Sequence, residues 1–346
     1  MAKKQISAGG IKIGGGAPVT VQSMTNTKTE DVEATSAQIQ RLCDAGCEIV
    51  RLAVPNKEAA RAIASYKERF NIPIVADIHF DYKLAIESAE AGADKIRINP
   101  GNIGGEDRVK AVVNECRLKD IPIRIGVNGG SLEKELLAKY GGVTARALFE
   151  SAMGHVRLLN KFDFDDICIS AKASDVPLTV ATYRMLAEET DYPLHLGVTE
   201  AGTEYAGTIK SAVGIGALLM EGIGDTIRIS LTAPPEREVR AGIELLKAAG
   251  LREDGVTFIS CPSCGRCNID LIKIAGEVEE KLAGCKKNIT VAVMGCAVNG
   301  PGEASAADYG LAGGNGEGVL FMKGEIVRKV PMDTLADELI RLINEE

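Results

Sequence analysis

The chain has 346 residues, of which 45% are hydrophobic and 25% charged, and this length allows two domains with a large buried core. Its net charge of −8 and pI near 5.2 argue against a nucleic acid partner, because neutralising phosphates needs a basic face. No apolar targeting segment or long apolar run occurs, so we expect a cytoplasmic protein that does not enter a membrane. Nine cysteines, an odd number, indicate a metal site or free thiols rather than a disulfide framework.

Residues 5–16 predict a small hairpin, after which strand and helix patterns alternate eight times. The expected strands are 19–25, 48–54, 73–79, 95–99, 123–128, 166–172, 194–200 and 226–232. The expected helices are 31–45, 57–69, 82–91, 106–119, 144–161, 176–190, 208–221 and 235–249. Eight such pairs without a dinucleotide-binding glycine fingerprint predict an α/β fold, a (β/α)₈ TIM-like barrel rather than a doubly wound sheet.

Side chains on a strand alternate between its two faces. One set of alternate positions is apolar in these strands and should face the helices, while the other is polar or small and should point into the barrel. Five inward positions on five strands are cations: Arg51, Arg97, Arg124, Lys172 and Arg228. Buried cations need partners, and Asp77 and Glu200 can pair with only some of them. The excess predicts a diphosphate-sized anion, because Arg binds phosphate oxygens bidentately.

A short polar link, residues 250–255, leads to a second domain, so we expect domains at 1–253 and 254–346. The second should contain strands at 257–260 and 289–294, a helix at 268–283, and a hairpin at 318–330 that turns at Lys323-Gly324. Asp333 should cap a final helix with Leu335, Leu339 and Leu342 inward. These elements predict a small α/β module.

The second domain carries the motif Cys261-Pro-Ser-Cys264-Gly-Arg-Cys267, and Cys296 follows its second strand. Thiolates select zinc or iron–sulfur clusters. Structural zinc usually takes four Cys or His ligands in two close pairs, whereas this region has one close pair and no His. A [4Fe-4S] cluster on three Cys and a weaker fourth ligand is therefore favoured, with Glu303 aimed by the preceding Gly-Pro-Gly turn. Zinc that recruits Cys267 or Cys285 stays open.

Cys261-Pro-Ser-Cys264-Gly-Arg and Gly295-Cys296-Ala-Val-Asn-Gly-Pro-Gly-Glu303-Ala resemble the cluster motifs of the 4-hydroxy-3-methylbut-2-en-1-yl diphosphate synthase family. The resemblance covers essentially the whole chain, in the short bacterial form of the family. It implies a sulfite-reductase-like second domain whose cluster ligands are Cys261, Cys264, Cys296 and Glu303. Cys267 lies outside that ligand set.

The resemblance also implies the substrate, 2-C-methyl-D-erythritol 2,4-cyclodiphosphate. Two-electron reduction would open its ring and expel water, giving 4-hydroxy-3-methylbut-2-enyl diphosphate in the methylerythritol phosphate route to isoprenoids. Positions that match the family's substrate ligands are Arg51, Arg97, Arg124, Asn128, Lys172, Arg228 and Ser230. Glu200 resembles a proton donor, although an ion pair with Lys172 or Arg228 is equally compatible, and Asp77 and His79 should orient neighbouring Arg side chains. Reduced flavodoxin or ferredoxin would supply the electrons.

The link predicts a homodimer. The eighth barrel helix should end at the amino-end face, and six extended residues span at most ~20 Å, too short to bring the cluster to its own barrel's mouth. Each second domain should therefore cap the barrel of the other copy, as the family resemblance also implies.

Two alternatives for the function stay open. One is a phosphate-binding barrel enzyme, such as an aldolase or pteroate-type synthase, with a structural zinc module. The other is a non-catalytic iron–sulfur sensor.

Overall fold

The computed structural model describes residues 2–253, 255–283, 285–296, 302, 304–314 and 316–345. The chain divides into two compact units, Met1–Arg252 and Glu253–Glu346. This boundary lies one residue before the predicted division between 253 and 254.

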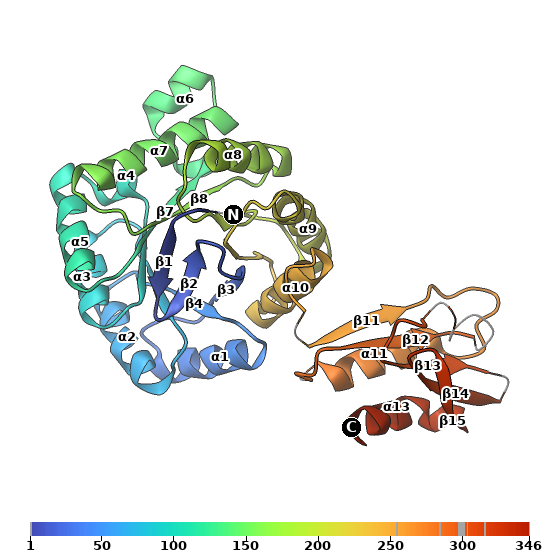
Figure 1. Ribbon diagram of the computed structural model, residues 1–346. Coiled ribbons are helices and arrows are strands. Elements are labelled where there is room, and N and C mark those ends of the chain that lie inside the picture. The colour runs from blue at the N-terminus through green and yellow to red at the C-terminus, as the bar shows by residue number, and fades with distance from the viewer. Residues whose placement is uncertain are drawn as a thin grey trace. The chain divides into compact units, whose positions relative to one another are not determined.

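The first unit is an eight-stranded parallel barrel (Figure 1). Its strands are β3 (Thr20–Met24), β4 (Ile49–Ala53), β5 (Ile74–Asp77), β6 (Lys95–Ile98), β7 (Ile123–Asn128), β8 (Ile167–Lys172), β9 (His195–Leu196) and β10 (Thr226–Ile227). The hydrogen-bonded order is β8-β7-β6-β5-β4-β3-β10-β9, and a bridge between Ile169 and Leu194 joins β8 to the segment before β9. The predicted barrel is confirmed, although its last two strands are shorter than expected.

A ring of helices surrounds the strands (Figure 1). They are α1 (Val32–Asp44), α2 (Lys57–Arg69), α3 (Tyr82–Glu90), α5 (Glu106–Leu118), α7 (Ala145–Lys161), α8 (Val176–Glu189), α9 (Glu204–Met220) and α10 (Pro235–Ala248). Side chains of Asp31, Asn56 and Asp175 cap the starts of α1, α2 and α8. The short helices α4 (Pro100–Ile103) and α6 (Lys134–Tyr140) and the 3-10 turn Gly129–Ser131 were not predicted.

The two faces of the barrel strands are divided as the alternation predicts. The apolar positions join the helices in one large core, represented by Leu52, Ile98 and Ile125. An antiparallel hairpin, β1 (Gln5–Ala8) and β2 (Ile11–Gly14), precedes the barrel. Its Ile6 and Ile13 pack with inward residues near the strand starts, among them Ile49, Val75 and Cys168. The hairpin therefore closes the amino end of the barrel.

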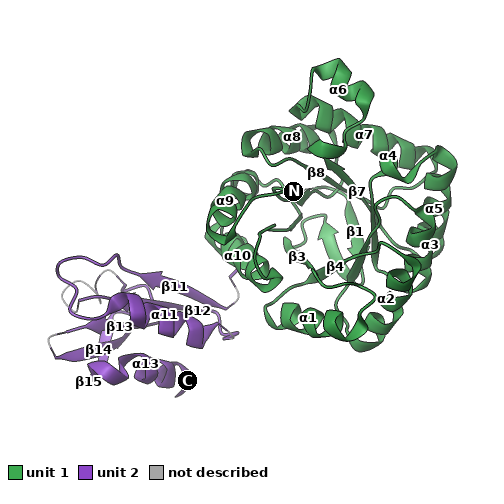
Figure 2. Cartoon of the chain, turned by 180° about the vertical axis from the view of Figure 1, so that it is seen from behind, with its two compact units in different colours: residues 1–252 green, residues 253–346 purple. Residues whose placement is uncertain are grey.

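In its described residues, the second unit contains a five-stranded sheet and the helices α11 and α13 (Figure 2). Its strands are β11 (Val256–Ser260), β12 (Ile289–Met294), β13 (Tyr309–Gly313), β14 (Glu317–Met322) and β15 (Glu325–Pro331), in sequential order. The pairs β11–β12 and β12–β13 are parallel, and the remaining two are antiparallel. Helices α11 (Leu271–Leu282) and α13 (Leu335–Glu345) share one hydrophobic cluster with the sheet.

Two local predictions for this unit have different outcomes. The β14–β15 hairpin turns at Lys323-Gly324, where both residues have left-handed backbone (φ 49° and 83°), so that prediction is confirmed. Asp333 is not the cap of the last helix, because it lies inside a 3-10 turn, Met332–Thr334, that precedes Leu335. Among the described residues, no helix is both long and apolar enough to cross a membrane.

Candidate functional site

Cationic side chains are concentrated inside the barrel, on the strand face opposite the helices. They are Arg51 on β4, Lys95 and Arg97 on β6, Arg124 on β7, Lys172 on β8 and Arg228 just after β10. Five of the six are predicted from the sequence, and Lys95 is the one that the prediction omits. Coulombic interactions couple Lys172 to four of the Arg side chains and Lys95 to two of them, so the six charges form one cluster.

Asp77, the last residue of β5, is an anionic centre within this cluster. Its Oδ1 lies 3.0 Å from Nη1 of Arg97, and its Oδ2 lies 3.7 Å from Nε of Arg51 and 3.5 Å from Nε2 of His79. Burial by itself would raise the pKa of the Asp77 carboxyl, but Arg51, His79 and Arg97 hold that pKa well below its usual value. Asp77 therefore stays ionised and orients two of the cations, as expected.

Arg228 has a carboxylate partner that sequence reasoning did not identify. Oε2 of Glu238, on α10, lies 3.2 Å from Nη2 of Arg228. Glu238 is 4% exposed and also accepts hydrogen bonds from the Ser23 hydroxyl and the Leu231 N–H. Because Glu238 is on a helix rather than a strand, the strand alternation carries no signal for it.

Glu200 lies in the turn after β9 and is exposed. Its backbone is left-handed, with φ 53°, a conformation that costs a non-glycine residue ~1–2 kcal/mol. In the described part of the chain it forms no ion pair with Lys172 or Arg228, so the predicted ion-pair alternative is wrong. The left-handed turn at Glu200 lies beyond the end of β9. Its exposed carboxylate is therefore at the carboxyl end of the barrel.

Lys95, Arg124 and His195 are deeply buried polar side chains, each at most 1% exposed. Within the described chain, Nζ of Lys95, Nε and Nη1 of Arg124 and both ring nitrogens of His195 have no hydrogen-bond partner. Burial and neighbouring positive charge lower the pKa of Lys95 to about 8 and that of Arg124 to about 10. The same two causes lower the pKa of His195 well below its usual value, so its ring is neutral.

Two inward glycines leave room for the cations. A Cβ at residue 126 would lie 2.8 Å from Nη2 of Arg97. A Cβ at residue 197 would lie 3.0 Å from Cε of Lys172 and 2.8 Å from the carbonyl oxygen of Arg228. Real Cβ atoms essentially never show the 2.8 Å contacts, so Gly126 and Gly197 allow long cationic side chains to extend across the neighbouring strands.

The predicted uncharged ligands lie at the carboxyl end. The side-chain amide of Asn128 is oriented so that its nitrogen donates to a carbonyl oxygen and its oxygen accepts from an N–H group. In this orientation the oxygen accepts a hydrogen bond from Nη2 of Arg97 at 3.3 Å. Ser230 is half-buried two residues after Arg228.

Glu133 lies 3.0 Å from Nε2 of His155. Burial would raise the pKa of Glu133, but His155 and hydrogen bonds lower this pKa to about 2. His155 therefore has a structural role.

Among the described residues, the cluster sets six cations against two carboxylates, Asp77 and Glu238. Buried donors without partners are costly, and an anion would satisfy several of them at once. Arg side chains from different strands could each bind phosphate oxygens through paired N–H groups. The arrangement is thus suited to holding a compact ligand with several negative charges.

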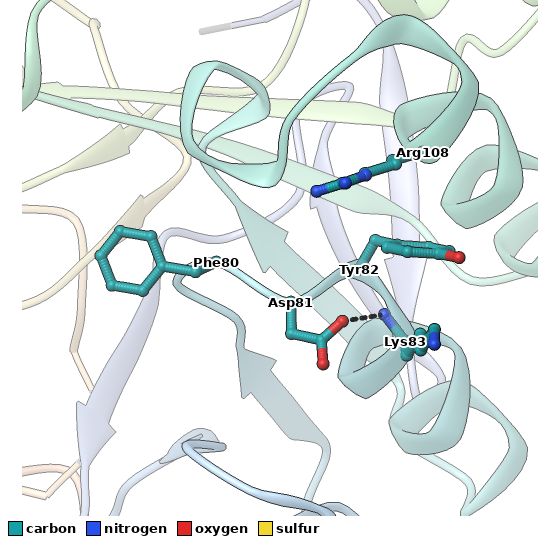
Figure 3. A pocket seen from close by; sticks show the side chains of 5 residues that line it. All are labelled: Phe80, Asp81, Tyr82, Lys83 and Arg108. Atoms are coloured by element: carbon teal, nitrogen blue, oxygen red, sulfur yellow. Dashed lines mark hydrogen bonds between the residues drawn. The ribbon is translucent and has the colours of Figure 1, made fainter.

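A separate cavity of about 420 Å³ lies beside the loop that follows β5, lined by Phe80, Asp81, Tyr82, Lys83 and Arg108 (Figure 3). Asp81 accepts a hydrogen bond from the N–H of Lys83 and so caps α3, while Arg108 lies 5.9 Å from the centre of the Tyr82 ring. None of its residues is a predicted ligand. Asp81 and Arg108 have local structural partners, so we favour the barrel interior as the candidate site.

Three cysteines of the second unit, Cys261, Cys264 and Cys296, lie on segments that follow the ends of two parallel strands. Cys261 directly follows β11, and Cys296 follows β12 after Gly295. Because β11 and β12 are paired, the N–H of Gly295 donates to Sγ of Cys261 at 3.1 Å. Cys264 lies in the turn between Cys261 and Cys267 and is exposed. Three of the four predicted cluster ligands are therefore on adjacent segments, and Glu303, the fourth, lies outside the described residues.

Cys267 differs from these thiols. Its Sγ donates to the carbonyl oxygen of Ile269 at 3.2 Å, whereas its packing against the hydrophobic cluster of the sheet is shared with Cys261. No three Cys, His, Asp or Glu side chains in the described segments are close enough to share one metal ion. Thiolates are ligands for both zinc and iron–sulfur clusters, so these cysteines are candidate metal ligands.

Comparison with known proteins gives matches over both units. Residues 3–243 match the GcpE TIM-barrel domain, and residues 257–345 match the GcpE protein C-terminal domain. The chain is 60% identical over 337 residues to a 4-hydroxy-3-methylbut-2-en-1-yl diphosphate synthase (flavodoxin) of Geobacter sulfurreducens, covering 97% of this chain and 96% of the relative. A Bacillus subtilis protein of the same name is 58% identical over 341 residues, covering 99% and 90% of the two chains.

Solved structures show similarity to the barrel. A dihydropteroate synthase of Yersinia pestis superposes with a TM-score of 0.51 at 14% identity, covering 71% of this chain and 97% of that structure. One from Xanthomonas albilineans gives 0.51 at 14% identity, with 70% and 96% covered. At this identity the similarity shows the fold alone.

Proposed function

The chain belongs to the GcpE family, and from this premise we propose that it reduces 2-C-methyl-D-erythritol 2,4-cyclodiphosphate to 4-hydroxy-3-methylbut-2-enyl diphosphate. Two electrons enter, a ring carbon–oxygen bond breaks, a carbon–carbon double bond forms, and a hydroxyl group leaves with a proton as water. The observation that carries this proposal within the molecule is the excess of buried cations in the barrel. A cyclic diphosphate provides the compact, multiply charged anion that those cations require.

We assign substrate binding to Arg51, Arg97, Arg124, Asn128, Lys172, Arg228 and Ser230. The unpaired N–H groups of Arg124 and the contact between Asn128 and Arg97 support this assignment. Glu200 is the proposed proton donor, because it is an exposed carboxylate at the carboxyl end that is not engaged by the barrel cations. Its strained backbone is typical of residues held in place for a functional reason.

We propose a [4Fe-4S] cluster held by Cys261, Cys264, Cys296 and Glu303. The thiols support this, since they leave the ends of two paired strands beside Gly295. When bound, the cluster would supply electrons to the substrate through an iron whose carboxylate ligand, Glu303, is exchanged more easily than a thiolate. The alternative, a phosphate-binding barrel enzyme with structural zinc, requires a fourth thiol from Cys267 or Cys285. Cys267 donates a hydrogen bond to the carbonyl oxygen of Ile269, and Cys285 precedes the start of β12, whereas Cys296 follows its end.

Flavodoxin is the proposed electron donor, because the curated relatives carry it in their names. We propose the cytoplasm as the location, since free cluster-ligating thiols persist where disulfides do not form. The decisive experiment is anaerobic turnover of the cyclic diphosphate with reduced flavodoxin, with product detection by mass spectrometry and parallel iron, sulfide and zinc analysis. A colourless zinc protein without turnover would refute the proposal.

We further propose a homodimer with composite active sites. Arg252, at the end of the first unit, lies 3.2 Å from Glu48, which immediately precedes β4, so the chain leaves the barrel at its amino end. Only three residues separate Arg252 from Val256, the start of β11, and three extended residues span ~10 Å. This short link supports cluster delivery to the carboxyl end of a barrel by a second copy.

A further inference from the structure

A second group of polar side chains lies below the proposed substrate site, towards the amino end of the barrel. Thr20, Thr226 and His195 are Cα partners across β3, β10 and β9, so they lie side by side on the inward face. Gln22 and Lys95 are partners of two inward residues that pack against the β1–β2 hairpin. These five side chains are each at most 4% exposed, and we call them the lower polar cluster.

The lower polar cluster is not satisfied by protein atoms. Within the described chain, the hydroxyls of Thr20 and Thr226, both amide atoms of Gln22, Nζ of Lys95 and both ring nitrogens of His195 have no hydrogen-bond partner. Buried polar groups without partners are costly, and native interiors satisfy them with water or a ligand. Every one of these side chains can present an N–H or O–H donor. A ligand that only accepts hydrogen bonds would therefore suit all five.

The balance of charge favours an anion over water. Among the described residues, the six barrel cations face the carboxylates of Asp77 and Glu238. A cyclic diphosphate has one ionised oxygen on each phosphorus, so the proposed substrate still leaves two positive charges without a partner. At the amino end, Asp225 and Glu48 accept hydrogen bonds from backbone N–H groups, and burial raises the pKa of the Cys168 thiol, which keeps it neutral.

From this excess we infer that the lower polar cluster binds a monovalent anion, chloride, between Lys95 and His195. The inference goes beyond the proposed function and rests on it only for the charge of the substrate. The two anions would occupy different levels, because Lys172 is the last residue of β8, whereas Lys95 and His195 are the first residues of β6 and β9. A strand rises ~3.3 Å per residue, so the six residues of β8 span ~17 Å.

The surroundings of the cluster favour a small ion. Ile6 and Ile13 of the hairpin pack on the inward residues at this level, so part of the wall is apolar. A halide is less strongly hydrated than phosphate and loses less on entering such a place. A cavity of about 520 Å³ at the hairpin, lined by Lys12, Thr20 and Glu48 among others, provides the route of entry from the amino end.

The test follows urea unfolding of the full-length chain, purified anaerobically, in sodium chloride or in sodium gluconate at equal ionic strength. An anion that binds only the folded chain should lower the unfolding equilibrium constant nearly tenfold for each tenfold increase in chloride above its dissociation constant, whereas gluconate should not. Lys95→Met should remove this response, and Lys210→Met, at an exposed position, is the control. In gluconate, Lys95→Met should be more stable than the wild type, because the buried ammonium then has no counter-ion.

Two further measurements locate the anion. Thr226→Val keeps the shape and charge of the cluster but removes one donor, so it should weaken chloride binding roughly fivefold. Crystals grown in sodium bromide should show an anomalous peak beside Nζ of Lys95. The chloride response should persist in saturating pyrophosphate, which occupies the upper level of the barrel.

Equal responses to chloride and gluconate, or loss of the response in pyrophosphate, would overturn the inference. An anomalous peak found only beside Lys172 and Arg228, or water density without an anomalous signal at Lys95, would overturn it as well. All of these outcomes leave turnover of the cyclic diphosphate unaffected. A chain that keeps the chloride response but shows no turnover would instead refute the proposed function and leave the chloride site standing.

Discussion

The guanidinium of Arg97 lies directly over the Cα of Gly126 on the neighbouring strand, within 2.8 Å of where a Cβ would stand. Arg97 is 8% exposed and is held from the other side by Asp77 at 3.0 Å, so it has little space to move. A single methyl group at residue 126 should therefore displace the guanidinium. The anion site depends on the absence of a side chain as much as on the cations themselves.

We expect Gly126→Ala to weaken binding of the cyclic diphosphate by roughly ten- to a hundredfold, because a charge-assisted hydrogen bond contributes about 1.5–3 kcal/mol. The measurement is KM, supported by calorimetric titration with inorganic pyrophosphate. Iron content should not change. Gly105→Ala, at a helix start where a Cβ meets nothing within 4 Å, is the control. Equal affinities in the two variants would show that Arg97 does not bind the anion.

Lys95 gives the sharpest prediction about pH. Its pKa is lowered from 10.5 to about 8, chiefly by burial, so the unfolded chain binds more protons between those values and stability should rise from pH 8 to 10.5. Lys95→Met should remove this slope and raise the free energy of unfolding at pH 7 by up to about 3 kcal/mol. Denaturant titrations of the full-length chain across this pH range test it.

The same substitution should weaken pyrophosphate binding, because one buried positive charge beside Arg124 is lost. Gaining stability while losing affinity is the expected signature of a residue kept for its charge. Lys210→Met, on the exposed surface, should alter neither quantity. If Lys95→Met destabilised the fold at pH 7, an unidentified anionic partner would have to balance the lysine.

The omission of Lys95 from the sequence prediction has a clear physical reason. Its position, two residues before Arg97, points inward by simple alternation, but a lysine at the start of a strand usually extends its ammonium to water. Here the hairpin of β1 and β2 closes that end, with Ile6 and Ile13 packed on the inward residues. Burial of Lys95 thus depends on a segment some 85 residues earlier in the chain.

The other correct and missed sequence predictions also separate into local patterns, which the sequence shows, and contacts between distant segments, which it does not. The alternation on β4, β6 and β7 predicts Arg51, Arg97 and Arg124 correctly as inward, because period 2 is a local property. Glu238 was missed because its pairing joins a helix to a strand end, which no local pattern encodes. Strand β9 has two residues rather than the seven expected, and the chain turns at Glu200 with a left-handed backbone.

The cysteine turn allows a comparison between neighbours. Cys264→Ser should abolish iron binding, whereas Cys267→Ser should keep the iron and lose at most about 1 kcal/mol of stability, because it removes one hydrogen bond to Ile269. Iron and sulfide analysis after anaerobic purification distinguishes the two. Glu303→Ala should retain most iron but little turnover. Loss of the cluster in Cys267→Ser would show that the proposed ligand set is wrong.

An active site built from two chains can be distinguished from a site within one chain by mixing two inactive variants. A Glu303→Ala chain has an intact barrel, an Arg124→Ala chain has intact cluster ligands, and each should be nearly inactive alone. If the cluster of one copy serves the barrel of the other, a mixed dimer contains one complete site, formed by the Arg124-bearing barrel and the Glu303-bearing second unit. Activity should therefore reappear after subunit exchange, approaching a quarter of the wild-type rate in an equimolar mixture, because half of the dimers are mixed and each has one working site of two. Exchange should be verified with a mass tag, and unmixed Arg124→Ala serves as the control. A mixture that exchanges fully yet stays inactive would mean that each cluster serves the barrel of its own chain.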